Sequence, residues 1–275
     1  MKIIFSNSGW AYLARGLTSR ISKAQAHDAT VQLNAGVRYF DARITLVNGE
    51  YYTSHGFLSV HLSSVLTEII TFLNSHPGEF ILFHIAQNYP LNQSFEPLAE
   101  YIASVTVDGK SLFDFVNYDT TETNPSLITY NDVTANHTKG GVVILSNATG
   151  LEAQYTDYFK INAFSVWHDA MDHTLLLEKA DSYYQTMIGN STFDNKFCIN
   201  QLQCTPSYSD IWSALASWSL LNKAQTDNVE SIDYPNFATW LQEMPIVIFD
   251  YTTSTYGNFN MRVISILTEY NLSLT

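Results

Sequence analysis

Four side chains that can bind an anion or transfer a proton lie within or directly after apolar segments. Asp41 and Arg43 are two residues apart, so a strand there places both on one side. His55 and Asp250 each follow a short apolar segment. An arginine can hold a phosphoryl oxygen, a histidine can transfer a proton near neutral pH, and a carboxylate can orient that histidine. Together these residue types suit chemistry on a phosphorylated substrate.

A purely structural interpretation fits the same residues. Asp41 and Arg43 could form a buried ion pair inside a barrel, and His55 could be an ordinary loop histidine whose hydrogen bonds are satisfied. The spacing alone leaves both interpretations open.

The elements that must position these residues alternate between short apolar strands and amphipathic helices, the pattern that builds parallel sheets. No charge run, Pro/Gly-rich linker or repeat divides the chain. We expect an α/β fold in a single domain over residues 1–275: a TIM-like (β/α) barrel, regular or incompletely closed. A doubly wound open sheet fits the same pattern. The predicted strands are Ile3–Phe5, Val37–Ile44, Tyr51–Ser54, Phe80–Ile85, Val142–Leu145, Phe197–Asn200 and Ile246–Phe249.

The clearest helix is predicted from His61 to Ser75, where apolar residues recur at the spacing of one helix face. His76-Pro77-Gly78 then ends it. Similar patterns predict helices near Leu175–Ile188, Ile211–Asn222 and Met261–Tyr270.

A longer motif contains the first three chemical residues. The segment Gly36–Arg43 reads GVRYFDAR, and His55-Gly56 begins twelve residues after Arg43. This motif resembles the X-region signature of phosphatidylinositol-specific phospholipase C in its bacterial, metal-independent form, which carries Gly-x-Arg-x-Phe-Asp-x-Arg followed by His-Gly. Pro77-Gly78-Glu79-Phe80, opening a strand, also fits. The likeness extends from about Ile3 to Tyr251 and is most specific between Gly36 and Gly56.

The resemblance implies a role for each of these residues. In that family one histidine removes a proton from the inositol 2-hydroxyl, which attacks the phosphate, and a second histidine protonates the departing diacylglycerol oxygen. By this likeness His55 is the general acid, Arg43 stabilises the phosphate and Asp41 is an orienting carboxylate. Asp250 matches the carboxylate that supports the first histidine.

The first histidine is missing from this chain. The family places it at the end of the first strand, and the matching stretch here has Ser6 at that position and Asn7 beside it. A serine hydroxyl is no general base at neutral pH, and losing a positioned base typically costs about 10²–10⁴-fold in rate. His27 lies too close to Asp41 to be the displaced histidine, so we interpret it as a surface or helix residue.

Two further departures affect the substrate pocket. The bacterial enzymes have a lysine where this chain has Ala86 and Gln87, and an arginine where it has Ser146 and Asn147. The calcium-dependent relatives need acidic residues near Ala86 and at Arg43, and these are absent. We therefore expect neither a catalytic metal nor a cofactor, and a pocket with less positive charge than an inositol phosphate site favours.

Another candidate base lies in the segment Ser165–Asp169, where His168 and Asp169 could face the pocket. The simpler interpretation is that His168 packs beside Trp167. We include His168 and Asp169 among the candidate substrate-binding residues, together with Asn7, Ala86 and Ser146.

Composition limits the partners. The net charge of −13 repels nucleic acids and anionic membrane surfaces, so we expect no nucleic acid partner, and the longest apolar runs are too short to span a bilayer. We expect a phospholipid or inositol-phosphate-like small molecule and transient membrane contact, and the resemblance favours a secreted or extracellular location. Cys198 and Cys204 are predicted to be free thiols.

Two functions follow. The first is a metal-independent phosphodiesterase of phospholipase C type with altered or reduced activity. The second is a pseudoenzyme whose barrel binds a phosphorylated or polyol ligand.

Overall fold

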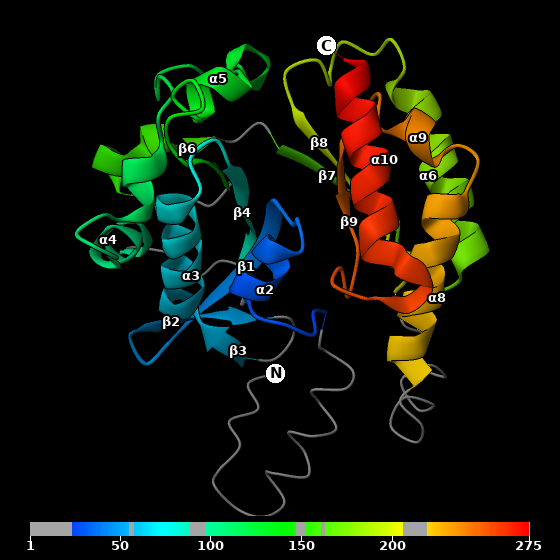
Figure 1. Ribbon diagram of the computed structural model, residues 1–275, viewed down its shortest axis with the longest axis horizontal. Coiled ribbons are helices and arrows are strands. Elements are labelled where there is room, and N and C mark those ends of the chain that lie inside the picture. Colours follow the sequence, from blue (N-terminus) through cyan, green and yellow to red (C-terminus); the bar gives the residue numbers. More distant parts are fainter. Residues whose placement is uncertain are drawn as a thin grey trace, which may run out of the picture.

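The computed structural model describes residues 24–54, 58–88, 97–146, 152–160, 163–205 and 219–274, and shows two groups of strands flanked by helices (Figure 1). The strands are β1 Tyr39–Val47, β2 Glu50–Ser54, β3 Leu58–His61, β4 Phe80–Asn88, β5 Gly141–Ser146, β6 Phe159–Lys160, β7 Ala163–Trp167, β8 Phe197–Gln201 and β9 Ile246–Ile248. The α-helices are α2 Ala29–Asn34, α3 Leu62–Ser75, α4 Leu98–Ser104, α5 Tyr130–Val133, α6 His173–Met187, α8 Ser219–Asp233, α9 Phe237–Trp240 and α10 Phe259–Ser273. Short 3₁₀ turns span Leu112–Phe115, Pro125–Leu127, Ala153–Tyr158 and Tyr256–Asn258.

The first sheet has the strand order β3-β2-β1-β4-β5-β6, with β1, β4, β5 and β6 parallel. The predicted strand Tyr51–Ser54 belongs to β2, but β2 is an antiparallel hairpin arm rather than one of the parallel strands. The reason is the two-residue turn Asn48-Gly49, in which both φ angles are positive (53° and 82°). Asn-Gly favours this tight hairpin turn, whereas a parallel neighbour needs a long crossover.

The second sheet has the order β7-β8-β9, all parallel. Among the described residues, no strand pairing joins the two sheets into a closed ring. The predicted first strand, Ile3–Phe5, lies outside the described residues. The predicted α/β fold with parallel strands is confirmed, in its incompletely closed form.

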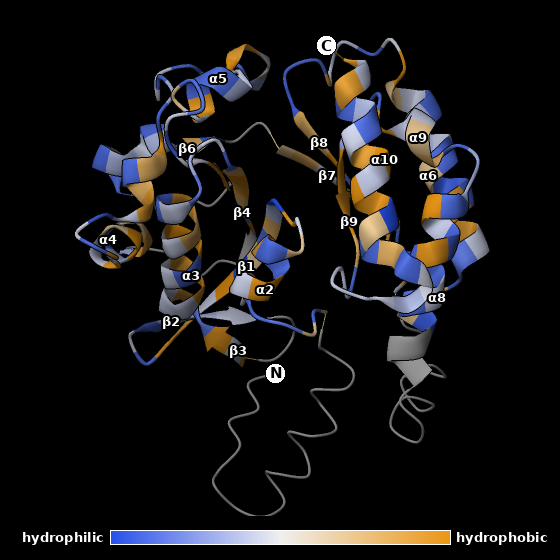
Figure 2. Cartoon of the chain, in the orientation of Figure 1, coloured by the Kyte–Doolittle hydropathy of each residue, from blue (hydrophilic) through white to orange (hydrophobic). Residues whose placement is uncertain are grey.

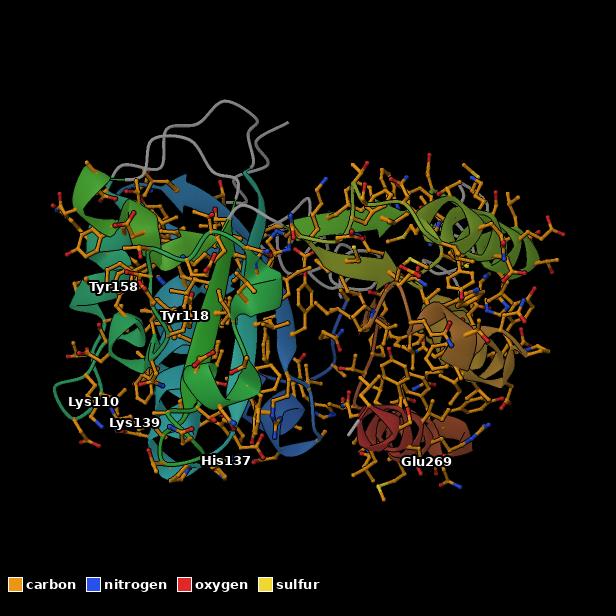
Figure 3. All side chains as sticks on the ribbon, turned by 90° about the horizontal axis from the view of Figure 1, so that it is seen from above. Lys110, Tyr118, His137, Lys139, Tyr158 and Glu269 are labelled. Carbon is orange, nitrogen blue, oxygen red and sulfur yellow. The ribbon has the colours of Figure 1, made fainter. Side chains whose placement is uncertain are left out.

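An interior cluster of apolar side chains packs between the two sheets. Its buried members come from β4, β5 and the connection between them, and residues of β7, β8 and β9 pack against it. The buried members are Leu82, Tyr118, Val133, Val143 and Leu145, and the contacts from the second sheet are Ala163, Phe197 and Ile246. In Figure 3, Tyr118 lies in the half that carries β5, and Glu269 lies on α10 in the other half. The space enclosed by the strands is thus filled by side chains at this level, as in a (β/α) barrel.

Two further cores lie between the sheets and their helices. One joins β1, β4 and β5 to α3 and α4, and the other joins β8 and β9 to α6, α9 and α10. The strands are mainly apolar, while α3, α8 and α10 carry both apolar and polar residues (Figure 2). Among the described residues, no helix combines the length and apolarity needed to cross a bilayer.

The predicted helices are observed with one substantial correction. α3, α6 and α10 match their predicted ranges to within three residues at each end. The helix expected at Ile211–Asn222 is described only from Ser219, and it continues to Asp233 as α8. Its second half was missed because the buried face there is polar, with Asp227, Asn228 and Ser231 all buried.

Candidate functional site

The side chains of β1 alternate between two environments. Ala42 and Ile44 are buried in the core beneath the helices. Tyr39 packs on the interior cluster, and Asp41 and Arg43 share its side of the strand. The Arg43 Nε lies 3.9 Å from an Asp41 carboxylate oxygen. Arg43 therefore belongs to the interior side of β1 and not to the helix layer, and it is about one-third exposed.

Asp250 follows β9 and interacts with Arg43. Burial raises the pKa of the Asp250 carboxyl to about 7, and the positive charge of Arg43 opposes that rise. The guanidinium on β1 and the carboxyl after β9 are therefore close enough to interact, although they belong to different sheets. The structure thus brings together Asp41, Arg43 and Asp250 from the sequence-predicted set.

The position of Asp250 is fixed by hydrogen bonds on both sides. The amide of Asn228, on α8, donates to the Asp250 carbonyl over 2.6 Å. The Gln25 side chain donates to the Phe249 carbonyl (2.9 Å) and accepts from the Thr252 backbone N–H (3.0 Å). The segment before α2 and the inner face of α8 together position the end of β9.

A buried pair, Tyr39 and His84, lies beside these charges and was missed by the sequence analysis. Burial and the charge of Asp41 raise the pKa of Tyr39, so its hydroxyl is protonated, and it is hydrogen-bonded to His84 Nδ1 over 2.6 Å. Burial lowers the pKa of His84 to about 4, so the ring is neutral at pH 7. With a pKa of about 4, His84 is a much weaker base than an ordinary histidine, so it is poorly suited to replace the missing base. The signal in the sequence was one histidine within the apolar strand Phe80–Ile85.

The ends of β7 and β8 add polar groups on the interior side. Gln201 donates to the Ser165 hydroxyl over 2.7 Å, and its buried Oε1 has no hydrogen-bond partner among the described residues. Trp167, at the end of β7, is 59% exposed. These residues provide one acceptor for a ligand hydroxyl and one exposed aromatic surface.

The register between β1 and β4 shifts next to the charged residues. Asp41 pairs with His84, but Arg43 pairs with Gln87, so β4 has one more residue in this interval. Such bulges redirect a strand locally and are frequent beside functional sites. Ala86 lies in this irregular part of β4.

His168 and Asp169 do not form the predicted second base. His168 is buried on the helix-facing side of β7, where its Nε2 donates to Asn200 Oδ1 over 2.7 Å. Burial lowers the pKa of His168. Asp169 is exposed at a positive φ of 46°, and its carbonyl accepts from Lys179. The simpler interpretation, a packed histidine, agrees with the burial of His168, whose ring lies edge-on to Tyr183.

Ser146 is a second correction. It is buried, and it shares its side of β5 with Val142 and Ile144, which lie in the core beneath the helices. Its side chain therefore faces away from the interior. Ser6, Asn7 and His55 lie outside the described residues. His27 is exposed just before α2, as predicted, and both cysteines are free.

The site consists of one guanidinium, two carboxyls and neutral polar side chains at the C-terminal ends of parallel strands. Arg43 can bind an anionic oxygen, and Asp41 and Asp250 can accept hydrogen bonds or orient a proton-transferring group. Barrel enzymes place their reactive residues at this end of the strands.

Comparison with known proteins finds relatives in sequence but no matching family model. The chain is 28% identical over 196 residues to a 1-phosphatidylinositol phosphodiesterase of Listeria monocytogenes, an alignment that covers 69% of this chain and 58% of that protein. It is 33% identical over 86 residues to the human PI-PLC X domain-containing protein 2, covering 30% of this chain and 28% of that protein. The chain therefore spans less than two thirds of the length of these curated relatives.

Solved structures share the fold. A crystal structure of a phosphatidylinositol-specific phospholipase C from Staphylococcus aureus superposes with a TM-score of 0.61 at 18% identity, covering 91% of this chain and 86% of that one. The enzyme from Listeria monocytogenes superposes with a TM-score of 0.57 at 19% identity, covering 93% and 86%.

The fold is an incompletely closed α/β barrel with charged side chains in its interior. In sequence, the chain is similar to a bacterial phosphatidylinositol phosphodiesterase and to PI-PLC X domain-containing proteins, and in fold to phosphatidylinositol-specific phospholipases C.

Proposed function

We propose that this protein is a metal-independent phosphoric diester hydrolase or lyase of phospholipase C type, acting on a phosphatidylinositol-like phospholipid with altered or reduced activity. Arg43 stabilises the negative charge on the phosphate, Asp41 orients the reacting groups, and His55 protonates the departing oxygen. Asp250 corresponds to the carboxylate that supports the basic histidine in the family. Ser6 stands in place of that histidine here. Contact with a membrane is transient.

The observation that carries the proposal is the association of Arg43 with Asp41 and Asp250 across the two sheets. Arg43 is about one-third exposed and its Nε lies 3.9 Å from the Asp41 carboxylate, beyond hydrogen-bond distance, so this contact leaves the Nε–H able to bind an anionic oxygen. The free acceptor of Gln201 suits a polyol hydroxyl. Both features fit an inositol phosphate head group.

The second candidate function is a pseudoenzyme that binds a phosphorylated or polyol ligand without cleaving it. Ser6 at the position of the first histidine favours it, because serine cannot act as the base. His84, a buried histidine of the described site, is hydrogen-bonded to Tyr39 and has a pKa lowered by burial to about 4, so it is a weak base.

Turnover of phosphatidylinositol in mixed micelles tests the proposal. We expect slow release of diacylglycerol by the wild type, and a loss of about 10²–10³-fold in Arg43→Ala, because an aligned positive charge on the transition state contributes that much. His55→Ala should lose a comparable factor. Arg262→Ala is the matched control, since Arg262 forms a surface ion pair with Asp233.

Two results separate the candidate functions. Wild-type turnover that survives Arg43→Ala contradicts the proposed enzyme. An inactive wild type that binds inositol phosphate, and loses this binding in Arg43→Ala, favours the pseudoenzyme.

A further inference from the structure

The hydroxyl of Ser54, the last residue of β2, is buried and unpaired. Its oxygen Oγ has no hydrogen-bond partner in the part of the chain that the structure describes. A buried hydroxyl without a partner costs free energy, so proteins seldom keep one at a position where it does nothing. The roles proposed for Asp41, Arg43 and His55 leave this hydroxyl without a function.

The pairing of β1 with β2 places Ser54 beside Arg43. The two strands are antiparallel neighbours (Figure 1), and their register matches Ile44 with Thr53. One residue further along the same register, Ser54 lies opposite Arg43. Residues directly opposite each other in an antiparallel pair share a face of the sheet, with Cβ atoms about 5 Å apart. Ser54 therefore lies on the interior side of the sheet, with the charged residues of β1.

The environment of the neighbouring residues agrees with this placement. Tyr51 and Ile44 belong to the core beneath the helices. Because side chains alternate along a strand, Thr53 shares the side of Tyr51, and Ser54 takes the other side. The Thr53 hydroxyl donates to the Val60 carbonyl over 3.3 Å. The two adjacent hydroxyls of β2 thus differ, since that of Thr53 is bonded within the sheet and that of Ser54 has no described partner.

We propose that Ser54 is a substrate-binding residue whose hydroxyl donates a hydrogen bond to the phosphate that Arg43 holds. This inference rests on the proposed function, because both residues are assigned to the same anionic group. A guanidinium and a hydroxyl can donate to different oxygens of one phosphate. Ser54 is partly exposed as a residue, and rotation about its single side-chain bond turns the hydroxyl toward a bound ligand.

A phosphate oxygen suits this hydroxyl better than a neutral acceptor does. Hydrogen bonds to a charged acceptor are roughly twice as strong as those between neutral groups. In this chain Ala86 stands where the bacterial enzymes have a lysine. Ser54 therefore adds a donor to a pocket that has few cations.

Binding of inositol 1-phosphate, measured by phosphorus NMR titration, tests the proposal. We expect Ser54→Ala to weaken binding about 10–100-fold, because a hydrogen bond to a charged group is lost. Thr53→Val is the matched control. It removes the adjacent hydroxyl, which lies on the other side of β2, and should leave the affinity unchanged.

Thermal unfolding of the ligand-free chain distinguishes a binding role from a structural one. Ser54→Ala should have a Tm equal to or above that of the wild type, because its hydroxyl has no described partner to lose. Thr53→Val should lower the Tm slightly, because it removes the hydrogen bond to the Val60 carbonyl.

The assignment of Ser54 is overturned if Ser54→Ala binds inositol 1-phosphate as tightly as the wild type, or if it lowers the ligand-free Tm. Loss of binding in Arg43→Ala alone would show that the phosphate site stands and that only the role of Ser54 fails. If the wild type itself binds no inositol 1-phosphate, the proposed function fails and the role of Ser54 fails with it.

Discussion

At the scale of single residues, the site holds two titratable groups whose effects on stability oppose each other. The Asp250 carboxyl has a pKa raised by burial to about 7, and the His84 ring has a pKa lowered by burial to about 4. Between about pH 4 and pH 7 the folded protein retains a proton on Asp250 that the unfolded chain has lost. In nearly the same range the unfolded chain carries a proton on His84 that the folded protein lacks. The two contributions partly cancel in the wild type.

Substituting Asp250 should expose the contribution of His84. As pH rises from about 4 to 7, the wild-type fold loses stability, because Asp250 stays protonated in the folded state while the unfolded chain gains stability by ionising it. Asp250→Asn removes this loss. We expect the free energy of unfolding of Asp250→Asn to rise more steeply over this range than that of the wild type. Urea denaturation at pH 4.5, 6 and 7.5 measures it.

His84→Phe provides the opposite contrast. The neutral histidine stabilises the fold above about pH 6.5 and loses this contribution as pH falls toward 4, so the phenylalanine variant should be less sensitive to acid. If the free energy of unfolding depends on pH in the same way in the wild type and in both variants, the pKa shifts described for Asp250 and His84 are wrong.

The sequence predicted the charged part of the site better than its neutral part. Asp41 and Arg43 were found because spacing by two fixes a common side of a strand. Ser146 was misassigned because its side of β5 depends on where that strand begins, and His168 because a histidine after a strand can face either layer. The pairing of Tyr39 with His84 joins residues 45 positions apart. No local pattern in the sequence encodes such a contact.

At the scale of elements, the end of β9 depends on a contact from the other end of the chain. The Gln25 side chain makes three hydrogen bonds to this region, one to the Phe249 carbonyl and two from the backbone and hydroxyl of Thr252. These residues flank Asp250. The segment before α2 therefore acts as a brace for the carboxyl that faces Arg43.

Removing this brace should destabilise the fold and disturb the site. We expect Gln25→Ala to lower the free energy of unfolding by about 1–3 kcal/mol, because its partners remain partly buried and lose their hydrogen bonds. Gln32→Ala is the control, since Gln32 makes one exposed hydrogen bond to the His27 carbonyl and should change stability by less than about 0.5 kcal/mol. Equal effects of the two substitutions in urea denaturation would contradict the bracing role.

Element prediction succeeded where apolar periodicity was regular. α3 buries six apolar residues on one face and ends before Pro77, as its sequence pattern predicts. α8 was placed too early because its inner face binds the Asp250 carbonyl and His173 through polar side chains. The β1–β2 hairpin was missed although Asn48-Gly49 is a strong turn signal.

At the scale of the whole molecule, two sheets enclose a filled interior, and the polar residues gather at one end of the strands. The net charge of −13 makes the surface repulsive to anions, so Arg43 must attract a phosphate against that field. The chain resembles phosphatidylinositol-specific phospholipases C over most of its length, in sequence over 69% of the chain and in fold over 91%.

The central claim is that this pocket is a phospholipase C site that lacks one base. It is tested most directly by the rate of phosphatidylinositol cleavage after Ser6→His, measured with Arg43 present and in the Arg43→Ala background. We expect a gain of about 10²–10⁴-fold with Arg43 present and little gain without it, because the restored base acts on a phosphate that Arg43 holds. An unchanged rate after Ser6→His, or the same gain in both backgrounds, would contradict the claim.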